Sequence, residues 1–167
     1  YKAHARPTPY LGGAALLLAF LVGVVPLGED FSRLSPIVLC AAGLWVLGTA
    51  DDRLHLSPSL RAAFEAGAAG VLWASGLGWD VVDSDFVNLL FTCLWVVGVT
   101  NAFNFMDNMD GAATSLGLVT AGAIAALAII GDDIALAVLA LGLLGACAGF
   151  LPYNLSSPAR IFLGDGG

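Results

Sequence analysis

Residues 112–151 read AATSLGLVTAGAIAALAIIG, then DD, then IALAVLALGLLGACAGFL: two apolar runs separated only by Asp132 and Asp133. The runs are 20 and 18 residues long, about the length at which an α-helix crosses the roughly 30 Å hydrocarbon core of a bilayer. Neither run alternates apolar and polar residues, as a membrane-spanning strand would. The stretch therefore predicts two transmembrane helices joined by a short turn.

The same pattern extends along the chain. Hydrophobic residues make up 59% of the 167 positions and charged residues 11%, a composition outside the usual range of soluble domains. Six apolar segments can be distinguished, and only Glu65 places a charge inside one of them. The segments are 10–27, 35–50, 62–78, 86–103, 112–131 and 134–151. The expected fold class is all-α: a polytopic integral membrane helical bundle with six transmembrane helices.

We expect residues 1–167 to form a single membrane domain that is incomplete at both ends, because the sequence does not begin with methionine and stops within a glycine-rich segment. The net charge of −7, without any basic stripe, excludes a nucleic-acid-binding surface. Cys40, Cys93 and Cys147 each lie in an apolar segment. We expect them to be small buried hydrophobic residues rather than metal ligands or a disulfide.

Charge distinguishes the two sets of connecting segments, which must lie on opposite sides of the membrane. One set comprises residues 1–9, 51–61, 104–111 and 152–167, and the other residues 28–34, 79–85 and 132–133. The first set holds five of the six basic residues, whereas the second holds one base and seven acids. Basic residues favour the cytoplasmic side, so we expect the first set to be cytoplasmic.

The unusual polar residues all fall on this expected cytoplasmic set. Asp51 and Asp52 follow an uncharged helix at its C-terminal end, where the helix macrodipole disfavours anions. An ordinary polar helix end is one interpretation of the pair. The position also suggests that a cation compensates the two carboxylates.

A second polar cluster runs from Asn101 through Asn104 and Asp107 to Asp110. Spacings of three and four place Asn101, Asn104 and either Asp107 or Asn108 on one helical face, and Asp110 opens the next turn. The asparagines could simply bind a neighbouring helix. The aspartates beyond them favour a functional cavity, which polar groups at membrane depth usually mark.

Asp165 is the carboxylate of FLGDGG, residues 162–167, a motif that is weak evidence alone because glycines also suit a flexible tail. If Asp51, Asp52, Asp107, Asp110 and Asp165 converge, pairs about 6 Å apart repel by roughly 3 kcal/mol each at an effective dielectric of about 20. A cation would relieve this repulsion. Oxygen ligands suit Mg²⁺ or Mn²⁺, and Mg²⁺ is commonly bound by one or two carboxylates plus substrate phosphates. A phosphate-handling membrane enzyme is therefore favoured over a structural bundle.

The remaining charged residues are less specific. His4, two residues before Arg6, could help to bind an anion, whereas His55 is expected to be a surface residue. Glu65 follows Arg61 by four residues and can pair with it on one helix face. A structural ion pair and a role at a substrate both remain open for Glu65.

Four motifs, in order, resemble those of the polyprenyl-phosphate N-acetylhexosamine-1-phosphate transferases, the glycosyltransferase 4 family. They are KAHARPTPYLGG (2–13), GTADDR with LSPSLR (48–53 and 56–61), NAFNFMDNMDG (101–111) and GFLPYN through PARIFLGDGG (149–154 and 158–167). The residues of these motifs are most similar to those of the branch that transfers N-acetylglucosamine-1-phosphate to undecaprenyl phosphate. The sequence departs from the family pattern at Asn108, where glycine is common, and at Glu65, where glutamine is common.

The resemblance implies a Mg²⁺-dependent reaction, with Mn²⁺ as the alternative metal, at the cytoplasmic face of the plasma membrane. The phosphate of an undecaprenyl or decaprenyl carrier would attack UDP-N-acetylglucosamine, UMP would leave, and cell-envelope polysaccharide synthesis would begin; a homodimer is among the expected assemblies. The resemblance makes Asp165 and Asn104 the metal ligands, and Asp51, Asp52 and Asp165 the catalytic residues. It places at the substrates His4, Arg6, Arg61, Asn101, Asn104, Asp107, Asp110, Asn154 and Phe162, the last by stacking on uracil.

Three alternatives stay open at this point. The phospho-N-acetylmuramoyl-pentapeptide transferases of peptidoglycan synthesis carry similar motifs. An ion-coupled transporter would bury its acids in mid-helix and show repeat-related broken helices; here the acids lie at helix ends. A catalytically inactive homologue is the third.

Overall fold

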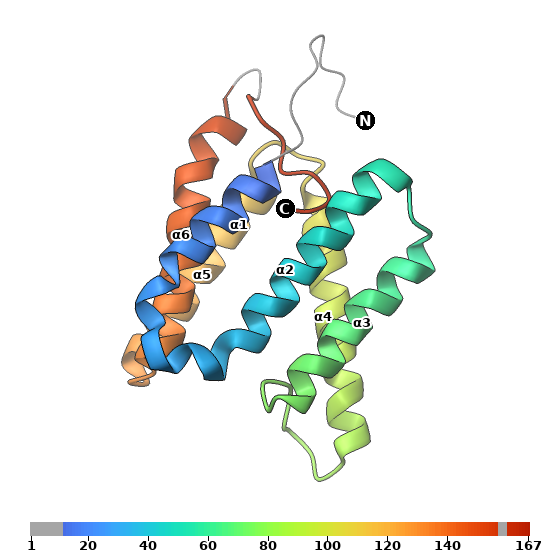
Figure 1. Cartoon of the computed structure of the whole chain (residues 1–167), viewed down its shortest axis with the longest axis vertical. Helices are drawn as coiled ribbons and strands as arrows, with labels where there is room; N and C mark the ends of the chain where they lie inside the picture. Colours follow the sequence, from blue (N-terminus) through green and yellow to red (C-terminus); the bar gives the residue numbers. More distant parts are fainter. Residues whose placement is uncertain (1–11, 157–159) are drawn as a thin grey trace.

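The computed structural model describes residues 12–156 and 160–167, and its regular elements are all helical in that part of the chain. This confirms the all-α prediction (Figure 1). The elements are α1 (Gly12–Gly23), the 3₁₀ segment η1 (Val25–Asp30), α2 (Phe31–Leu54), α3 (Pro58–Ala74), α4 (Asp85–Met106), α5 (Ala112–Ile130) and α6 (Ile134–Asn154).

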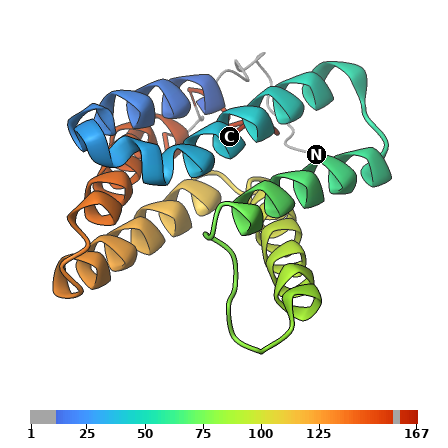
Figure 2. The same ribbon diagram turned by 60° about the horizontal axis from the view of Figure 1, so that its bottom comes forward.

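The helices pack in two groups, with α2 running between them (Figures 1 and 2). On one side α5 and α6 form an antiparallel pair and α1 packs on α6; on the other side α3 packs on α4 and α2 contacts α3. Small residues allow α1 and α6 to cross closely: a Cβ added to Gly23 would lie 2.7 Å from the Cα of Gly142. Such backbone approach is typical of helix packing in membranes.

The helix lengths modify the prediction of six spans. In the part of the chain that the structure describes, four helices, α2, α4, α5 and α6, are long and apolar enough to cross a membrane. The expected helix 10–27 is shorter in the structure, because α1 ends at Gly23 and the chain turns through η1, where Pro26 cannot continue an α-helix and Gly28 has φ 54°. The 12 residues of α1 extend only about 18 Å. The 17-residue α3 starts at Pro58, behind its N-cap Ser57.

The predicted buried cysteines are free thiols, with Cys147 buried and Cys40 and Cys93 half-buried. At the end of the bundle that carries η1, Arg33 at the start of α2 donates to Asp133 at the α5–α6 turn (Nη2 to Oδ1, 2.5 Å). Arg33, the basic residue of the second set of connecting segments, thus joins the start of α2 to the α5–α6 turn at this end of the bundle.

The opposite end gathers the polar residues. The α2–α3 turn, the α4–α5 turn, the end of α6, the start of α1 and the C-terminal segment all lie there (Figure 1). Contacts across this end, from Gly12 to Phe162 and from Gly111 to Asn154, join segments far apart in sequence. The predicted one-sided gathering is therefore confirmed for the described residues. His4 and Arg6 lie outside them.

Candidate functional site

The C-terminal segment, residues 160–167, is held by the first turn of α1. The backbone N–H groups of Gly12 and Gly13 donate to the carbonyls of Phe162 (3.0 Å) and Leu163 (2.8 Å). The first N–H groups of a helix have no partner within the helix, so they are available to fix this segment. The backbone of the FLGDGG motif is thereby attached to a helix end.

Glycines on α1 and α2 provide the space for the segment. A Cβ added to Gly48 would lie 2.0 Å from the carbonyl oxygen of Asp165, and one added to Gly12 would lie 2.3 Å from that of Phe162. Both atoms belong to backbone, which cannot rotate away as a side chain could. The sequence predicted a role for the Asp165 carboxylate but not the close packing of its segment against α1 and α2. The glycines inside the first two motifs were the signal from which this close packing could have been predicted.

Arg61 is the cation that the position of Asp51 predicted. Its Nη1 lies 2.6 Å from Asp51 Oδ2 and 3.6 Å from Asp165 Oδ2. Asp51 is buried, at 7% exposure, and its other oxygen accepts from the Leu56 N–H at 2.6 Å. The α2–α3 turn, with His55 in the left-handed region at φ 52°, brings Arg61 back over the end of α2.

The Asp165 carboxyl has two acidic neighbours, Asp51 and Asp52, and one basic neighbour, Arg61. Burial raises the pKa of its carboxyl, and so do neighbouring Asp52 and Asp51, while Arg61 lowers it in part. The Asp165 N–H also donates to Asp52 Oδ1 at 3.3 Å, which fixes the loop against α2. Asp51 and Asp165 thus share the Arg61 guanidinium, and Asp52 lies beside Asp165, an arrangement that an added cation would stabilise.

A cavity of about 570 Å³ opens between the two helix groups. Most of its wall is apolar and comes from α1, α2, α5 and α6. The polar lining comprises Arg61, Glu65, Asn104, Asp107 and Asp165, with threonines of α4 and α5. Four predicted site residues, from α3, α4 and the C-terminal segment, therefore line one space.

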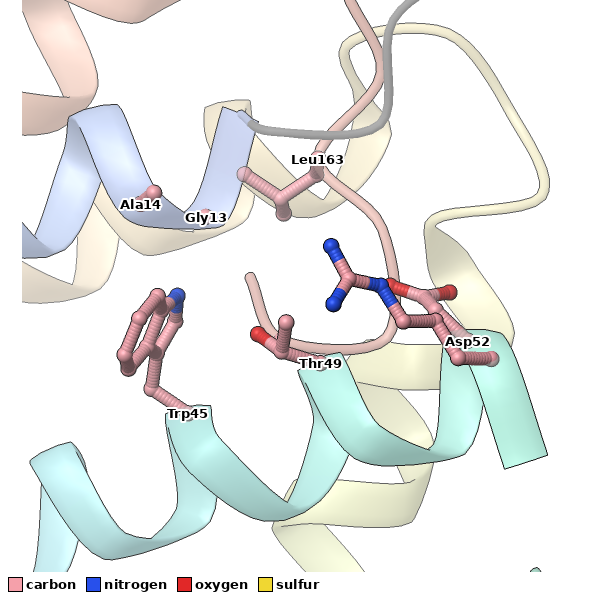
Figure 3. Close-up of a pocket in the computed structure, with 8 residues that line it drawn as sticks. Gly13, Ala14, Trp45, Thr49, Asp52 and Leu163 are labelled. Carbon is pink, nitrogen blue, oxygen red and sulfur yellow. The ribbon is translucent and has the colours of Figure 1, made fainter. Parts of the chain in front are cut away.

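A smaller pocket of about 300 Å³ lies between α1, α2 and the C-terminal segment (Figure 3). Trp45 and Thr49 on α2 face Ala14 on α1 across it, and Asp52 lies farther along α2. Asp52 lines this pocket but not the larger one, and Asp165 lines the larger one but not this one. The two carboxylates are thus neighbours that face different spaces.

Two predicted substrate residues are buried instead. Asn154 is 1% exposed; its Oδ1 accepts from the Gly111 N–H (3.0 Å) and Thr114 Oγ1 (3.2 Å), and its Nδ2 donates to the Ile161 carbonyl (3.1 Å). It holds the α4–α5 turn against the C-terminal segment. Phe162 is 6% exposed, so its ring offers no open face for stacking on uracil in this conformation.

Arg61 and Glu65, for which the sequence left an ion pair open, each have other partners in the structure. Arg61 binds Asp51 and Asp165, whereas Glu65 accepts from Asn101 Nδ2 at 2.5 Å. The helical spacing permitted the first pair, but Asp51, ten residues from Arg61, lies closer because of the α2–α3 turn. Asn101 is therefore turned toward α3.

Two predicted site residues lie at the α4–α5 turn. Asp110 is exposed there, and Asp107 is the C-cap of α4.

Asp165 and Asn104 carry oxygen atoms of the kind that Mg²⁺ takes as ligands in proteins. Among the described residues, no group of three or more His, Cys, Asp or Glu side chains could hold a metal. Asp165 and Asn104 nevertheless offer a carboxylate and an amide oxygen to the same cavity. Mg²⁺ is commonly held by one or two protein carboxylates together with substrate phosphates and water.

Three known proteins are similar to this chain over nearly its whole length. The chain is 33% identical, over 99% of its length, to a Bacillus subtilis (strain 168) protein named as a probable undecaprenyl-phosphate N-acetylglucosaminyl 1-phosphate transferase, of which it covers 49%. It is 35% identical, over 98%, to the decaprenyl-phosphate N-acetylglucosaminephosphotransferase of Mycolicibacterium smegmatis, covering 47% of it. It is 32% identical, over 96%, to a phospho-N-acetylmuramoyl-pentapeptide-transferase of Lactobacillus delbrueckii subsp. bulgaricus, covering 57%.

The chain spans about half the length of the curated relatives it matches. The family model described as glycosyl transferase family 4 matches residues 34–167, which include α2 through α6 and the segment that carries Asp165. With four ordered motifs, a polar site at one end of a helical bundle and this match, the chain belongs to glycosyl transferase family 4.

Proposed function

We propose that the full-length protein transfers N-acetylglucosamine-1-phosphate from UDP-N-acetylglucosamine to a polyprenyl phosphate and releases UMP. The observation that carries the proposal is the meeting of Asp51, Arg61 and Asp165 at the polar end of an otherwise apolar cavity, which Asn104 also lines. The names of the Bacillus and Mycolicibacterium relatives support the same sugar and carrier. A lipid phosphate and a nucleotide can meet only where membrane and water adjoin, at such an end.

Arg61 would bind a substrate phosphate. Its guanidinium is already held by buried Asp51, so little side-chain freedom is lost when a phosphate arrives. It lines the larger cavity beside Asp165, where donors of fixed orientation stabilise the charge that develops during phosphoryl transfer. Asp107, at the end of α4, would order the nucleotide side of the same space.

Asp165 and Asn104 would hold Mg²⁺. When bound, the ion supplies charge neutralisation at the pyrophosphate of the sugar nucleotide. The backbone hydrogen bonds from Gly12 and Gly13 and the close packing at Gly48 keep Asp165 in place before substrates arrive. This preorganisation is the contribution of the chain itself.

Asp52 would position the lipid phosphate. A phosphate monoester is largely ionised at neutral pH, so a general base is not required for its attack. The carboxylate lines the smaller pocket between α1 and α2, next to Arg53, while its neighbour Asp51 orients Arg61. The charge difference between the two sets of connecting segments favours the cytoplasmic face of the plasma membrane for this site.

The donor can be tested directly. We expect the purified full-length protein, given a polyprenyl phosphate and Mg²⁺, to release UMP from UDP-N-acetylglucosamine and to form a lipid-linked pyrophosphoryl sugar. The relative from Lactobacillus makes UDP-N-acetylmuramoyl-pentapeptide the second candidate donor. Faster UMP release from that donor would reverse the assignment, and release from neither would refute the proposed activity.

A further inference from the structure

A hydrogen bond joins Glu65, which is buried, to Asn101, an exposed residue of the neighbouring helix. Glu65 on α3 is 1% exposed, and Asn101 on α4 donates from Nδ2 to its Oε2 at 2.5 Å. The same amide donates to the carbonyl of Val97 at 2.9 Å, which fixes its orientation. Burial of a carboxylate is costly unless it is hydrogen-bonded, and a buried ionisable residue in a membrane helix is a functional candidate.

The position of this bond relates it to the site. Glu65 follows Arg61 by four residues along α3, and Asn101 precedes Asn104 by three residues along α4. Each spacing is about one helical turn on one face. The bond therefore lies one helical turn farther from the polar end of the bundle than Arg61 and Asn104 and joins the two helices that carry them. Glu65 also lines the cavity that both of those residues line.

We propose that the Glu65–Asn101 hydrogen bond is a cross-helix strut that sets the spacing of Arg61 and Asn104, and that Glu65 is a positioning residue for the transfer reaction. The inference rests on the proposed function. The strut needs an acceptor at the reach of a glutamate side chain and a donor amide opposite it, but not a negative charge. Length and charge can therefore be varied separately.

The test is a set of variants of the full-length protein, assayed for UMP release over a range of Mg²⁺ concentrations. Glu65→Gln retains an acceptor at the same reach and should keep turnover within about twofold, whereas Glu65→Asp withdraws the acceptor by one methylene and should lose turnover. Glu65→Ala and Asn101→Ala should each lower kcat/KM by up to about 100-fold, the cost of a displacement near 1 Å. The double variant should be no worse than either single variant, because both remove one interaction.

The Mg²⁺ dependence separates positioning from a general structural role. If the strut places Asn104, its loss should raise the Mg²⁺ concentration needed for half-maximal activity. Asn88→Ala is the matched control: Asn88 is another asparagine of α4 with side-chain hydrogen bonds, 4% exposed, and it accepts from the N–H groups of Val81 and Val82 at the far end of the helix. This control should lower the melting temperature and leave kcat/KM and the Mg²⁺ dependence unchanged.

Several results would overturn the strut. They are additive losses in the double variant, full activity of Glu65→Asp, an inactive but folded Glu65→Gln, or a Mg²⁺ dependence that shifts equally in Asn88→Ala. If Glu65→Ala does not fold, the comparison of Glu65→Gln with Glu65→Asp decides. An inactive wild-type protein would refute the proposed function and the strut with it, whereas an active wild type with additive losses refutes the strut alone.

Discussion

Gly48 lies against the backbone of the loop that carries Asp165, and adding one methyl group there tests whether the placement of this loop matters. A Cβ at Gly48 would be 2.0 Å from the Asp165 carbonyl oxygen, 2.4 Å from its carbonyl carbon and 2.6 Å from the Gly166 nitrogen. A real Cβ atom essentially never lies within 3.0 Å of such a neighbour, so the loop or α2 must move by about 1 Å. A displacement of this size at a catalytic group costs about 100-fold in rate.

We therefore expect Gly48→Ala to lower the rate of UMP release by about 100-fold and to raise the Mg²⁺ concentration required, while the helical content of the protein stays unchanged. Gly43→Ala is the matched control, because Gly43 lies on the same helix and a Cβ there meets no atom within 4 Å. That variant should be as active as the wild type, since alanine is also the better helix former. Full turnover by Gly48→Ala would refute the conclusion that the close contact at Gly48 positions Asp165.

Three further changes test the charges and hydrogen bonds of the site. Arg61→Ala leaves Asp51, 7% exposed, without its cation and should lower the free energy of unfolding by about 3 kcal/mol; unchanged denaturant stability in detergent would contradict this. Because burial and neighbouring acids raise the pKa of the folded-state Asp165 carboxyl, its stabilising contribution is present at acid pH and is lost as pH rises through that raised pKa. In Mg²⁺-free buffer Asp165→Asn should thus melt at a higher temperature than the wild type at neutral pH but not at acid pH. A difference in melting temperature that stays constant across the pH range would count against the raised pKa of Asp165. Asn154→Ala removes the hydrogen bonds to Gly111, Thr114 and Ile161 and should cost about 2 to 4 kcal/mol, seen as a lower melting temperature, and a wild-type melting curve would argue against this positioning role.

Charge alternation in the sequence was sufficient to predict the end of the bundle at which the polar residues meet. Each connecting segment must alternate sides, so an uneven distribution of basic residues assigns every loop at once. The macrodipole argument likewise predicted a cation beside Asp51, and Arg61 is that cation. These predictions depend on the order of the helices and on the end of the helix at which each residue lies. Both follow from the positions of the apolar segments in the sequence.

The sequence did not predict in the same way which of several possible partners each polar side chain contacts in the folded protein. Spacing showed that Glu65 could reach Arg61 but not that the α2–α3 turn would bring Asp51 closer, nor that α4 would present Asn101 to Glu65. The burial of Phe162 depends on how the C-terminal segment lies against α1. Pro26 was a local signal for the end of α1 and was outweighed by the apolar run around it.

We propose that Asp165, held between α1 and α2, binds the metal on which transfer depends. The most direct measurement is UMP release by the full-length protein from UDP-N-acetylglucosamine and a polyprenyl phosphate, with Mg²⁺ titrated for the wild type and for Asp165→Asn. We predict turnover by the wild type that requires Mg²⁺, and none by the variant at any Mg²⁺ concentration although it remains folded. Wild-type turnover by Asp165→Asn, or equal turnover of the wild type in the presence of a chelator, would contradict this claim.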